Sequence, residues 1–375
     1  MNKMERLDIN KNDYPITRVG SVKDIRTKKE PTESEMGEDI QDFSDRTSVK
    51  DFGDLGFATP GKGASMCATA VFNLENLGQL EMPTAYIGQI DETAILVNSV
   101  RVIDPEKEGD QAGVYNRIFP VEVIARDVIT ATSSAAKRLK DGRLHPDALG
   151  LTAFPWGDCF PIFPPKTYVD GSTKLRKPDQ YLYWYLLKDI ACATTSDMNA
   201  VDMLIRKVTE YGRQMARNAG FLLFDHKVEF GYDPSGNLIL IDVPLCLDEV
   251  TGALVGPYED LDDFTKKPFK IFQAGKNHSP EAVINASKQL YRDHYDAEHP
   301  EWCADVKRLL REGAKKSELP AAPQPPQELV DIVGAIYQAF ANAWAGEDRF
   351  NVPSLARCVE DYRRWATDHY ELRGD

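Results

Sequence analysis

Residues 224–231, FDHKVEFG, place acidic and basic side chains in a strand-like pattern. Read at period two, Asp225, Lys227 and Glu229 share one side, whereas His226 falls with the apolar residues on the other, as a core histidine would. On the pattern alone, a solvent-exposed strand face explains these residues as well as a chemical site does. If they do form a site, the carboxylates could hold a divalent ion and the ammonium an anionic group.

The next segment, GNLILID, favours the site. It is apolar up to Asp242, which predicts a strand buried on both faces with a charge at its end. A hairpin loop of two or four residues would put Glu229 and Asp242 directly opposite each other, where like charges repel. A Mg²⁺ ion bridging both carboxylates would remove that repulsion and leave Lys227 free to bind a phosphate or carboxylate. A three-residue loop would instead turn Asp242 to the other face.

A second group of polar residues lies in FPVEVIARD and the ITATSS that follows. Glu122 and Arg126 are four residues apart and share one face of an otherwise apolar strand. Because a buried charge without a partner is costly, they form either a structural ion pair or a substrate-recognition pair. The hydroxyls of Thr132, Ser133 and Ser134, with nearby backbone N–H groups, suit an oxyanion.

Two glycine-containing segments could approach a phosphate. GFATPGKG, 56–63, imitates the GxxxxGK[ST] loop, but Gly63 stands where a hydroxyl would bind Mg²⁺, so we reject that motif although Lys62 can still reach a ligand. RVGSVKDI, 18–25, predicts a strand–glycine–strand turn from which Lys23 projects. The histidines show no pair at metal spacing, and no GxSxG signature indicates a serine nucleophile.

Length, charge and cysteine usage narrow the class of protein. A chain of 375 residues is longer than one hydrophobic core usually supports, so we expect two lobes. With 59 acidic against 45 basic residues, the net charge of −14 argues against a nucleic-acid or anionic-membrane surface. The sequence has neither an apolar membrane span nor a secretory leader, and its six scattered cysteines include no CxxC pair. We expect reduced cysteines and a cytoplasmic protein.

The elements that must position these residues predict an α+β fold. Short apolar runs predict strands, with a helix near SMCATAVFNLENLG, and residues 104–113 and 166–180 read as loops. A long helix with Ser196 as its N-cap precedes the charged strand, and a last helix spans roughly Ser354 to Tyr370. Leu329, Val333, Ile336, Phe340 and Trp344 form one apolar stripe typical of core packing.

The predicted organisation has five parts. They are a flexible N-terminus (1–15), a β-rich nucleotide-binding lobe (16–118), a central α+β lobe with the metal and substrate site (119–313), a proline-rich linker (314–328) and a C-terminal helical segment (329–375). The last segment belongs either to the core or to a subunit interface of a homo-oligomer, and the sequence leaves both open.

In chain order, these motifs resemble those of the SAICAR synthetase (phosphoribosylaminoimidazole-succinocarboxamide synthase) family. DHKVEFG is similar to D-x-K-x-E-F-G, FSDRTSVKD with PGKGA to S-D-R-x-S-x-x-D and P-G-K-G-A, PVEVIAR to P-V-E-x-x-x-R, and SKQLYRD to D-K-Q-x-x-R-D. The resemblance covers roughly residues 16–293.

The resemblance implies an ATP-grasp-related fold with ATP between two lobes. It also implies an ADP-forming ligase that joins L-aspartate to carboxyaminoimidazole ribonucleotide through an acyl phosphate, with ATP and Mg²⁺. By matching position, Lys227, Glu229 and Asp242 would be catalytic, the last two holding Mg²⁺. ATP would be bound by Gly20, Lys23, Glu122 and Asp225. The other substrates would be bound by Asp45, Lys62, Arg126, Thr132, Ser133, Asp179 and Arg292.

The sequence departs from the family pattern at several places. Ser21 replaces one of two phosphate-facing cations, and Asp242 is followed by Val243 where Asp-Glu is expected, although Asp248-Glu249 could be that pair displaced. The Ser-Arg that would bind the ribose phosphate is absent from VTGALVGPYEDLDD. The alternatives are therefore a paralogous ligase that uses another acid, a nucleotide-binding regulator without catalysis, or a phosphotransferase on the same scaffold.

Overall fold

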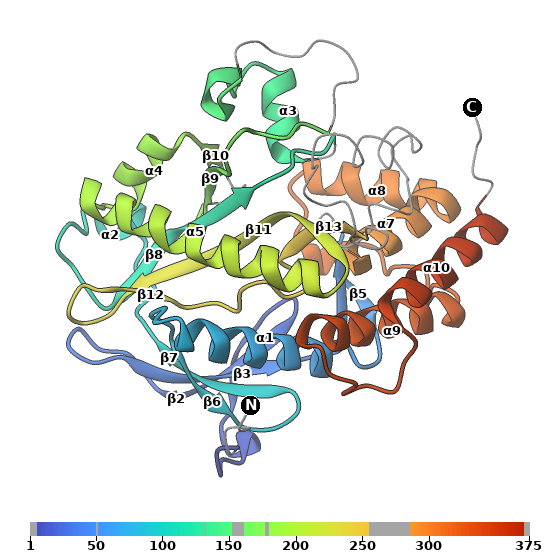
Figure 1. Ribbon diagram of the computed structural model, residues 1–375, viewed down its shortest axis with the longest axis horizontal. Coiled ribbons are helices and arrows are strands. Elements are labelled where there is room, and N and C mark those ends of the chain that lie inside the picture. The colour runs from blue at the N-terminus through green and yellow to red at the C-terminus, as the bar shows by residue number, and fades with distance from the viewer. Residues whose placement is uncertain are drawn as a thin grey trace.

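The computed structural model describes residues 6–49, 52–131, 133–151, 161–176, 180–254 and 286–370. Two antiparallel sheets and a set of helices make up this part of the chain (Figure 1). The N-terminal sheet has the order β1-β2-β3-β7-β6. Its strands are β1 (Ile16–Val19), β2 (Lys23–Lys29), β3 (Gly37–Phe43), β7 (Ala94–Ser99) and β6 (Tyr86–Gln89). A separate hairpin is formed by β4 (Arg46–Val49) and β5 (Gly53–Ala58).

The central sheet carries the candidate site and has the order β10-β9-β8-β11-β12, with β13 also paired to β11. Its strands are β8 (Arg117–Arg126), β9 (Tyr168–Thr173), β10 (Tyr181–Leu182), β11 (Phe221–Tyr232), β12 (Leu238–Leu240) and β13 (Val250–Leu254). The long β11 pairs with β8 along one edge, and along its other edge with β13 and then β12. Apolar and charged side chains alternate over residues 224–230 of β11, so this part of the sheet has one apolar and one charged face.

A short segment joins the two sheets. Ala85 N–H donates to the Leu240 carbonyl at 2.8 Å, and Leu240 N–H donates to the Pro83 carbonyl at 2.9 Å, so β12 is flanked by the residues that lead into β6. The end of β12 therefore lies beside the N-terminal sheet. Side chains of the two sheets can meet there.

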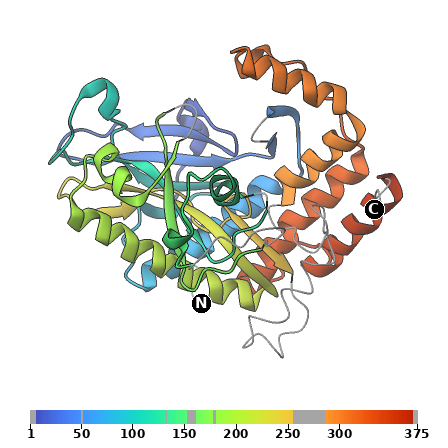
Figure 2. The same cartoon turned by 90° about the horizontal axis from the view of Figure 1, so that it is seen from above.

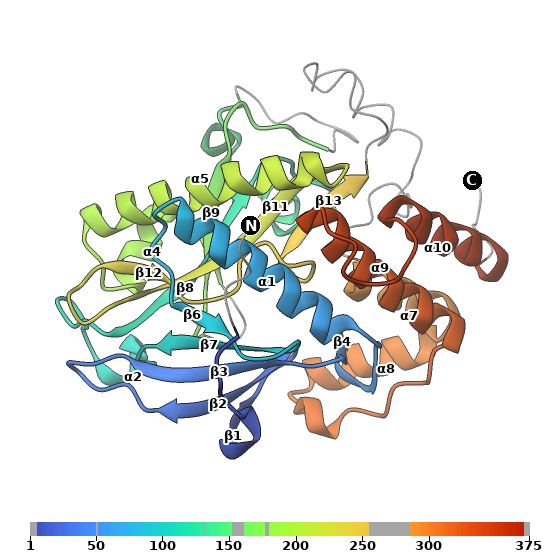
Figure 3. The same ribbon diagram turned by 60° about the horizontal axis from the view of Figure 1, so that its bottom comes forward.

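Helices cover the apolar faces of the sheets. α5 (Thr195–Asn218) packs on β11 and β8, and α4 (Trp184–Ile190) packs on β9. α1 (Lys62–Gln79) packs on the N-terminal sheet and against α9, and it crosses the molecule between that sheet and α5 (Figure 3). The shorter helices are α2 (Pro105–Glu108), α3 (Ser134–Lys140), η1 (Lys11–Asp13), η2 (Pro146–Leu149) and η4 (Lys316–Glu318).

The C-terminal helices form a block at one end of the sheets, coloured orange and red in Figure 2. They are α7 (Ala286–Glu298), α8 (Pro300–Arg311), α9 (Gln327–Ala345) and α10 (Leu355–His369). The predicted apolar stripe of α9 is buried in the same core as α1 and α5, which confirms that it is a packing face. The last helix, α10, agrees with the span expected from the sequence, and Ser354 caps it by accepting a hydrogen bond from the Arg357 N–H.

Three local predictions were wrong. Thr194, not Ser196, is the N-cap of α5, because its hydroxyl accepts from Asp197 N–H while the Asp197 carboxylate accepts from Thr194 N–H, a reciprocal capping box. The segment 166–180 contains β9, since pairing with β8 outweighs its turn-forming composition. Within 104–113, Pro105 starts the short helix α2.

No helix of the described residues is both long and apolar enough to cross a membrane.

Candidate active site

The polar face of the central sheet, called here the charged face, carries Asp225, Lys227 and Glu229 of β11 beside Glu122 and Arg126 of β8. Direct pairing of Asp225 with Arg126 and of Glu229 with Glu122 puts all five on one side, as the sequence pattern predicted. His226 lies on the opposite, apolar side, where Nε2 is 2.9 Å from the Thr209 hydroxyl of α5.

Lys227 lies at the centre of the charged face. Its Nζ is 2.9 Å from Glu229 Oε1, 3.3 Å from Glu249 Oε2 and 3.4 Å from Glu122 Oε1. Burial by itself would lower the pKa of Lys227, but these three carboxylates outweigh it and raise the pKa well above the ordinary value for lysine. Lys227 is therefore a fixed cation at any physiological pH.

Glu229 is the most buried acid of this group. Its side chain is 7% exposed, and its second oxygen, Oε2, lies 2.5 Å from Lys174 Nζ just beyond β9. Two lysines thus neutralise one carboxylate, which offsets its loss of hydration. Neither Lys174 nor a role for its charge was predicted, because the segment read as a loop.

The predicted opposition of Glu229 and Asp242 was wrong. Phe230 pairs with Leu240, and this register sets Ile241 rather than Asp242 opposite Glu229, as the three-residue-loop alternative required. The carboxylate that faces Glu229 directly belongs to Glu122. The repulsion expected between opposite carboxylates therefore arises across β8 and β11, and the Lys227 ammonium between them relieves it.

Asp242 nevertheless reaches the site from the neighbouring sheet junction. Its Oδ1 is 2.5 Å from the Nζ of Lys23, which also donates to Gln41 Oε1 at 2.7 Å. Although burial would raise the pKa of Asp242, the charges of Lys23 and Lys227 outweigh it and hold that pKa below its usual range. The Lys23–Asp242 ion pair joins the first strands of the chain to the central sheet.

The turn that carries Lys23 is held by backbone contacts. Gly20 N–H donates to the Lys23 carbonyl at 3.0 Å, and a Cβ at Gly20 would lie 2.5 Å from that oxygen, so only glycine fits. Arg46 Nη2 donates to the Gly20 carbonyl at 3.1 Å and pairs with Asp24. Asp45 faces elsewhere and accepts from Gly63 N–H at 2.7 Å at the start of α1.

Arg126 forms a buried network at the other end of the charged face. Its guanidinium is 3.2 Å from both Asp170 and Asp225, and Nη2 donates to the Ser134 hydroxyl at 2.9 Å. Burial would lower the pKa of Arg126, but these two acids raise it. Burial raises the pKa of Asp225, although Arg126 opposes that shift. Arg126 therefore pairs with aspartates rather than with Glu122.

The structure does not bring every predicted residue to this face. Lys62 is fully buried and pairs with Asp248 at 3.2 Å, and Ser133 caps α3 by accepting from Ala136 N–H. Arg292 lies on α7, with Nε 3.6 Å from Asp296. Thr132 and Asp179 fall outside the described residues.

Asp248 and Glu249, the possible displaced acidic pair, point in different directions. Glu249 points to Lys227 of the charged face, whereas Asp248 points to Lys62 on the other side of the loop. The sequence showed two adjacent acids before a strand, although in the structure both lie in a turn closed by the Glu249 N–H on the Cys246 carbonyl at 2.8 Å. It did not show which of the two would reach the site.

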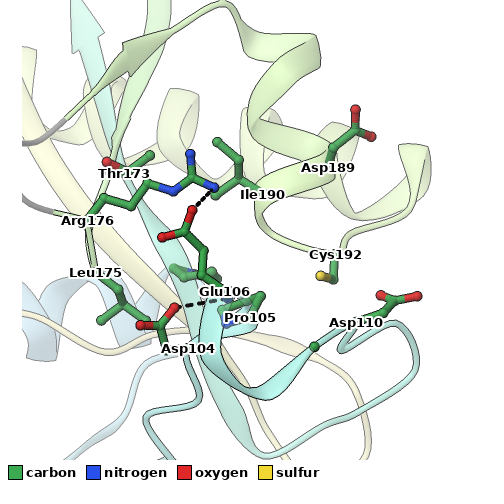
Figure 4. A pocket seen from close by; sticks show the side chains of 12 residues that line it. Asp104, Pro105, Glu106, Asp110, Thr173, Leu175, Arg176, Asp189, Ile190 and Cys192 are labelled. Atoms are coloured by element: carbon green, nitrogen blue, oxygen red, sulfur yellow. Dashed lines mark hydrogen bonds and ion pairs between the residues drawn. The ribbon is translucent and has the colours of Figure 1, made fainter.

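Two hollows lie near the central sheet. One cavity of about 400 Å³ is lined by Thr173, Arg176, Ile190 and Cys192 among others, and Figure 4 shows Arg176 paired there with Glu106. Thr173 belongs to the apolar side of β9, so this cavity is separate from the charged face. A narrower hollow between the sheets is lined by Gln41, Leu240 and Asp242, next to the Lys23 ion pair.

Comparisons with known proteins agree with this arrangement. A family model described as SAICAR synthetase matches residues 20–249. A relative from Archaeoglobus fulgidus, whose name assigns it provisionally as a phosphoribosylaminoimidazole-succinocarboxamide synthase, is 28% identical over 92% of this chain and 99% of its own length. The phosphoribosylaminoimidazole-succinocarboxamide synthase of Thermoplasma acidophilum is 24% identical over 81% of this chain and 92% of its own length.

Among solved structures, the SAICAR synthase of Saccharomyces cerevisiae complexed with SAICAR superposes with a TM-score of 0.61 at 19% identity. The alignment covers 89% of this chain and 95% of that one. A second SAICAR synthase structure gives a TM-score of 0.60 at 18% identity, over 92% of this chain and 99% of that one. These likenesses confirm the predicted α+β fold.

Proposed function

Because the chain belongs to the SAICAR synthetase family, ligases that form carbon–nitrogen bonds, we propose that it joins L-aspartate to carboxyaminoimidazole ribonucleotide with ATP as the energy source and Mg²⁺ as the metal. The observation that carries this proposal is the charged face itself, where carboxylates from β8, β11 and the 242–249 loop surround one ammonium. In the yeast relative, the bound molecule named with the structure is SAICAR.

In this reaction the protein contributes mainly by neutralising negative charge rather than by covalent chemistry. A carboxylate becomes an acyl donor only after phosphorylation, and the transferring phosphoryl group carries negative charge that fixed cations must offset. Lys23 and Lys227 are such cations: Lys23 pairs with Asp242, and Lys227 pairs with three carboxylates. We assign Lys23 and Gly20 to the ATP phosphates, with Glu122 and Asp225 bordering the nucleotide.

The acidic side chains fit Mg²⁺. Hard oxygen ligands suit this ion, which usually binds through one or two carboxylates together with phosphate oxygens. The carboxylates of Glu229 and Asp242 would hold it. Glu249, whose Oε2 lies 3.3 Å from Lys227 Nζ, would offer a further oxygen ligand. When bound, the ion would supply positive charge to the phosphates. Among the described residues no group of three His, Cys, Asp or Glu side chains is arranged to hold a metal ion.

We assign the opposite end of the charged face to the acid and amine substrates. The Arg126 guanidinium is locked by Asp170, Asp225 and Ser134, so it offers a positive charge without rotational freedom. Holding both reactants in a fixed orientation supplies much of the rate that such an enzyme needs. Asp45, Ser133 and Arg292, together with Thr132 and Asp179, stay predicted substrate contacts, whereas Lys62 is fully buried against Asp248 and away from the charged face.

The test is a coupled assay of ADP release with mass detection of the product. ADP release that needs ATP, Mg²⁺, aspartate and the nucleotide acid together, with formation of their amide, supports the proposal. ADP formed with a phosphorylated acid and no amide indicates a phosphotransferase. Nucleotide binding without turnover indicates a regulator that has lost catalysis.

One observation favours a second candidate, a ligase of the same chemistry that uses a different acid. The residues that follow Glu249, VTGALVGPYEDLDD, contain no arginine, whereas the family pattern has Ser-Arg there for the ribose phosphate. Turnover with ATP and aspartate on an acid that lacks a phosphate, and not on the ribonucleotide, would identify this alternative. We further propose a cytoplasmic enzyme of small-molecule substrates, and sedimentation would show whether it is a homo-oligomer.

A further inference from the structure

The loop between Asp242 and Glu249 carries one acid of the site at each end, so its position decides the geometry of both. Asp242 pairs with Lys23, and Glu249 pairs with Lys227. Between them, Leu245 adopts a left-handed backbone with φ of 59° and its side chain packs on Gly212 of α5, where a Cβ would lie 2.8 Å from Leu245 Cδ2. Such a conformation persists only where the surroundings enforce it.

Helices α1 and α9 support this loop from behind. Asn73 of α1 donates to the Pro244 carbonyl at 2.9 Å, and its own Oδ1 accepts from Trp344 Nε1 of α9 at 2.6 Å. The Cys246 thiol lies 3.7 Å from the Met66 carbonyl of α1. The loop therefore rests on a layer formed by residues distant from it in sequence.

The last contact in this layer is made by Tyr337 of α9. Its hydroxyl donates to Asp248 Oδ1 at 2.5 Å, and Asp248 Oδ2 lies 3.2 Å from Lys62 Nζ. The Lys62 ammonium is also 5.4 Å from the centroid of the Tyr337 ring and donates to the Arg46 carbonyl at 3.1 Å. Tyr337 and Lys62 are 1% and 0% exposed, and a buried ion pair needs such additional hydrogen bonds to be stable.

We propose that Tyr337 is a positioning residue for the ligase reaction: by holding the Asp248 carboxylate against Lys62, it sets the next residue, Glu249, at Lys227. Asp248 and Glu249 lie in one turn, in which the Glu249 N–H donates to the Cys246 carbonyl at 2.8 Å. Because Asp248 points from this turn to Lys62 and Glu249 points to Lys227, holding the Asp248 carboxylate also holds the turn that presents Glu249 to the charged face. Two contacts complete the link, because Lys227 N–H donates to the Glu249 carbonyl at 3.2 Å and the Glu249 carboxylate lies 3.3 Å from Lys227 Nζ.

This role comes from outside the part of the chain that the family model covers. The match ends at residue 249, whereas α9 spans Gln327–Ala345. Helix α9 thus contributes to the site through the 242–249 loop. The inference rests on the proposed function for its kinetic part, while its structural part can be measured independently.

The experiment compares Tyr337→Phe with Tyr295→Phe. Both changes remove one hydroxyl from a buried ring, and Tyr295 donates to the Pro323 carbonyl at 2.7 Å, away from the loop. Hydrogen exchange of residues 242–254 should become at least ~5-fold faster in Tyr337→Phe and stay unchanged in Tyr295→Phe. Unchanged exchange in both variants would overturn the proposal, whatever reaction the enzyme catalyses.

Kinetics separate positioning from general destabilisation. We expect kcat for ADP release to fall about 10-fold in Tyr337→Phe, with less than a 2-fold change in Tyr295→Phe. In a Glu249→Gln background, Tyr337→Phe should have almost no further effect on kcat, since coupled residues are not additive. Full additivity would show that Tyr337 does not act through Glu249 and would refute the proposal. Absence of ADP release from the wild-type enzyme would count against the proposed function, and the exchange data would still decide the positioning role.

Discussion

Replacing Lys227 by methionine is the sharpest test of the charged face. Methionine keeps the apolar length of the side chain but leaves Glu229, Glu249 and Glu122 around an uncharged atom. Removing one partner of a buried ion pair costs roughly 3–5 kcal/mol. The Lys227 side chain is 23% exposed and Lys174 still neutralises Glu229, so we expect a loss of about 3 kcal/mol in the free energy of unfolding.

The same change should remove catalysis. A cation fixed beside transferring phosphoryl groups acts mainly in the transition state, so kcat/KM should fall by more than ~10-fold, about 1.4 kcal/mol or above. Because folding raises the pKa of Lys227, the charge of this residue contributes fully to stability below the unfolded-state pKa of lysine, about 10. The contribution is lost only as pH rises through the higher pKa of the folded state. The stability difference from wild type should therefore be constant between pH 6 and pH 9.

Lys11→Met is the matched control. Lys11 is 17% exposed and pairs with Asp42 at 2.8 Å and Asp91 at 3.0 Å, in a setting of similar charge away from the charged face. We expect a comparable stability loss, about 2–3 kcal/mol, with kcat/KM unchanged. Urea unfolding and coupled ADP release measure the two quantities on the same preparations.

A second change separates stability from activity. Glu122→Gln added to Lys227→Met removes one of the carboxylates that lost their ammonium partner and should restore about 1 kcal/mol of stability without restoring turnover. If the double variant recovers activity along with stability, Lys227 is only a structural counter-ion. If Lys227→Met keeps more than a tenth of wild-type kcat/KM, the assignment of the charged face as the active site is refuted.

Further predictions concern the acids, the histidines and the C-terminal helices. Glu229→Gln and Asp242→Asn should each abolish ADP release while circular dichroism stays native; near-normal turnover in both would remove the metal assignment. Burial lowers the pKa of His294 to about 4, so the native state should lose about 2–3 kcal/mol as pH falls from 6.5 towards 4.5, and His294→Phe should flatten that slope in urea titrations. A chain ending before Gln327 should fail to give a cooperative thermal transition, because α9 buries Val333, Phe340 and Trp344 in the common core; a native-like melt would show that this segment is dispensable.

Sequence reasoning was most successful where a short pattern carries its own geometry. Period-two alternation placed Asp225, Lys227 and Glu229 together, and a glycine before Lys23 predicted the turn that presents it. It failed where the outcome depended on pairing between distant segments. The register of β11 with β12 rests on the length of one hairpin loop, and a shift of one residue moves Asp242 to the opposite face.

Residues brought in by long-range packing could not be found in this way. Lys174 follows a strand whose composition resembles a loop, and its proximity to Glu229 depends on the order β9-β8-β11 in the sheet. Asp170 is a partner of Arg126 only through the same order. Tyr337 lies 89 residues from Asp248, in a helix whose sequence shows only a packing stripe.

The charges of the site also explain how a face with so many acids can bind a triphosphate. Each lysine that faces the phosphates in the proposed function is held in this structure by a carboxylate: Lys23 by Asp242, and Lys227 by Glu229 and its neighbours. These carboxylates hold the cations in place, and they are also the oxygens that suit Mg²⁺. These carboxylates would hold a metal bound with its nucleotide, and the ion would supply positive charge there, so Lys23 and Lys227 would be left to pair with the phosphates. Each buried charge would then have a partner of opposite sign both with and without the nucleotide, which a face made of lysines alone could not provide.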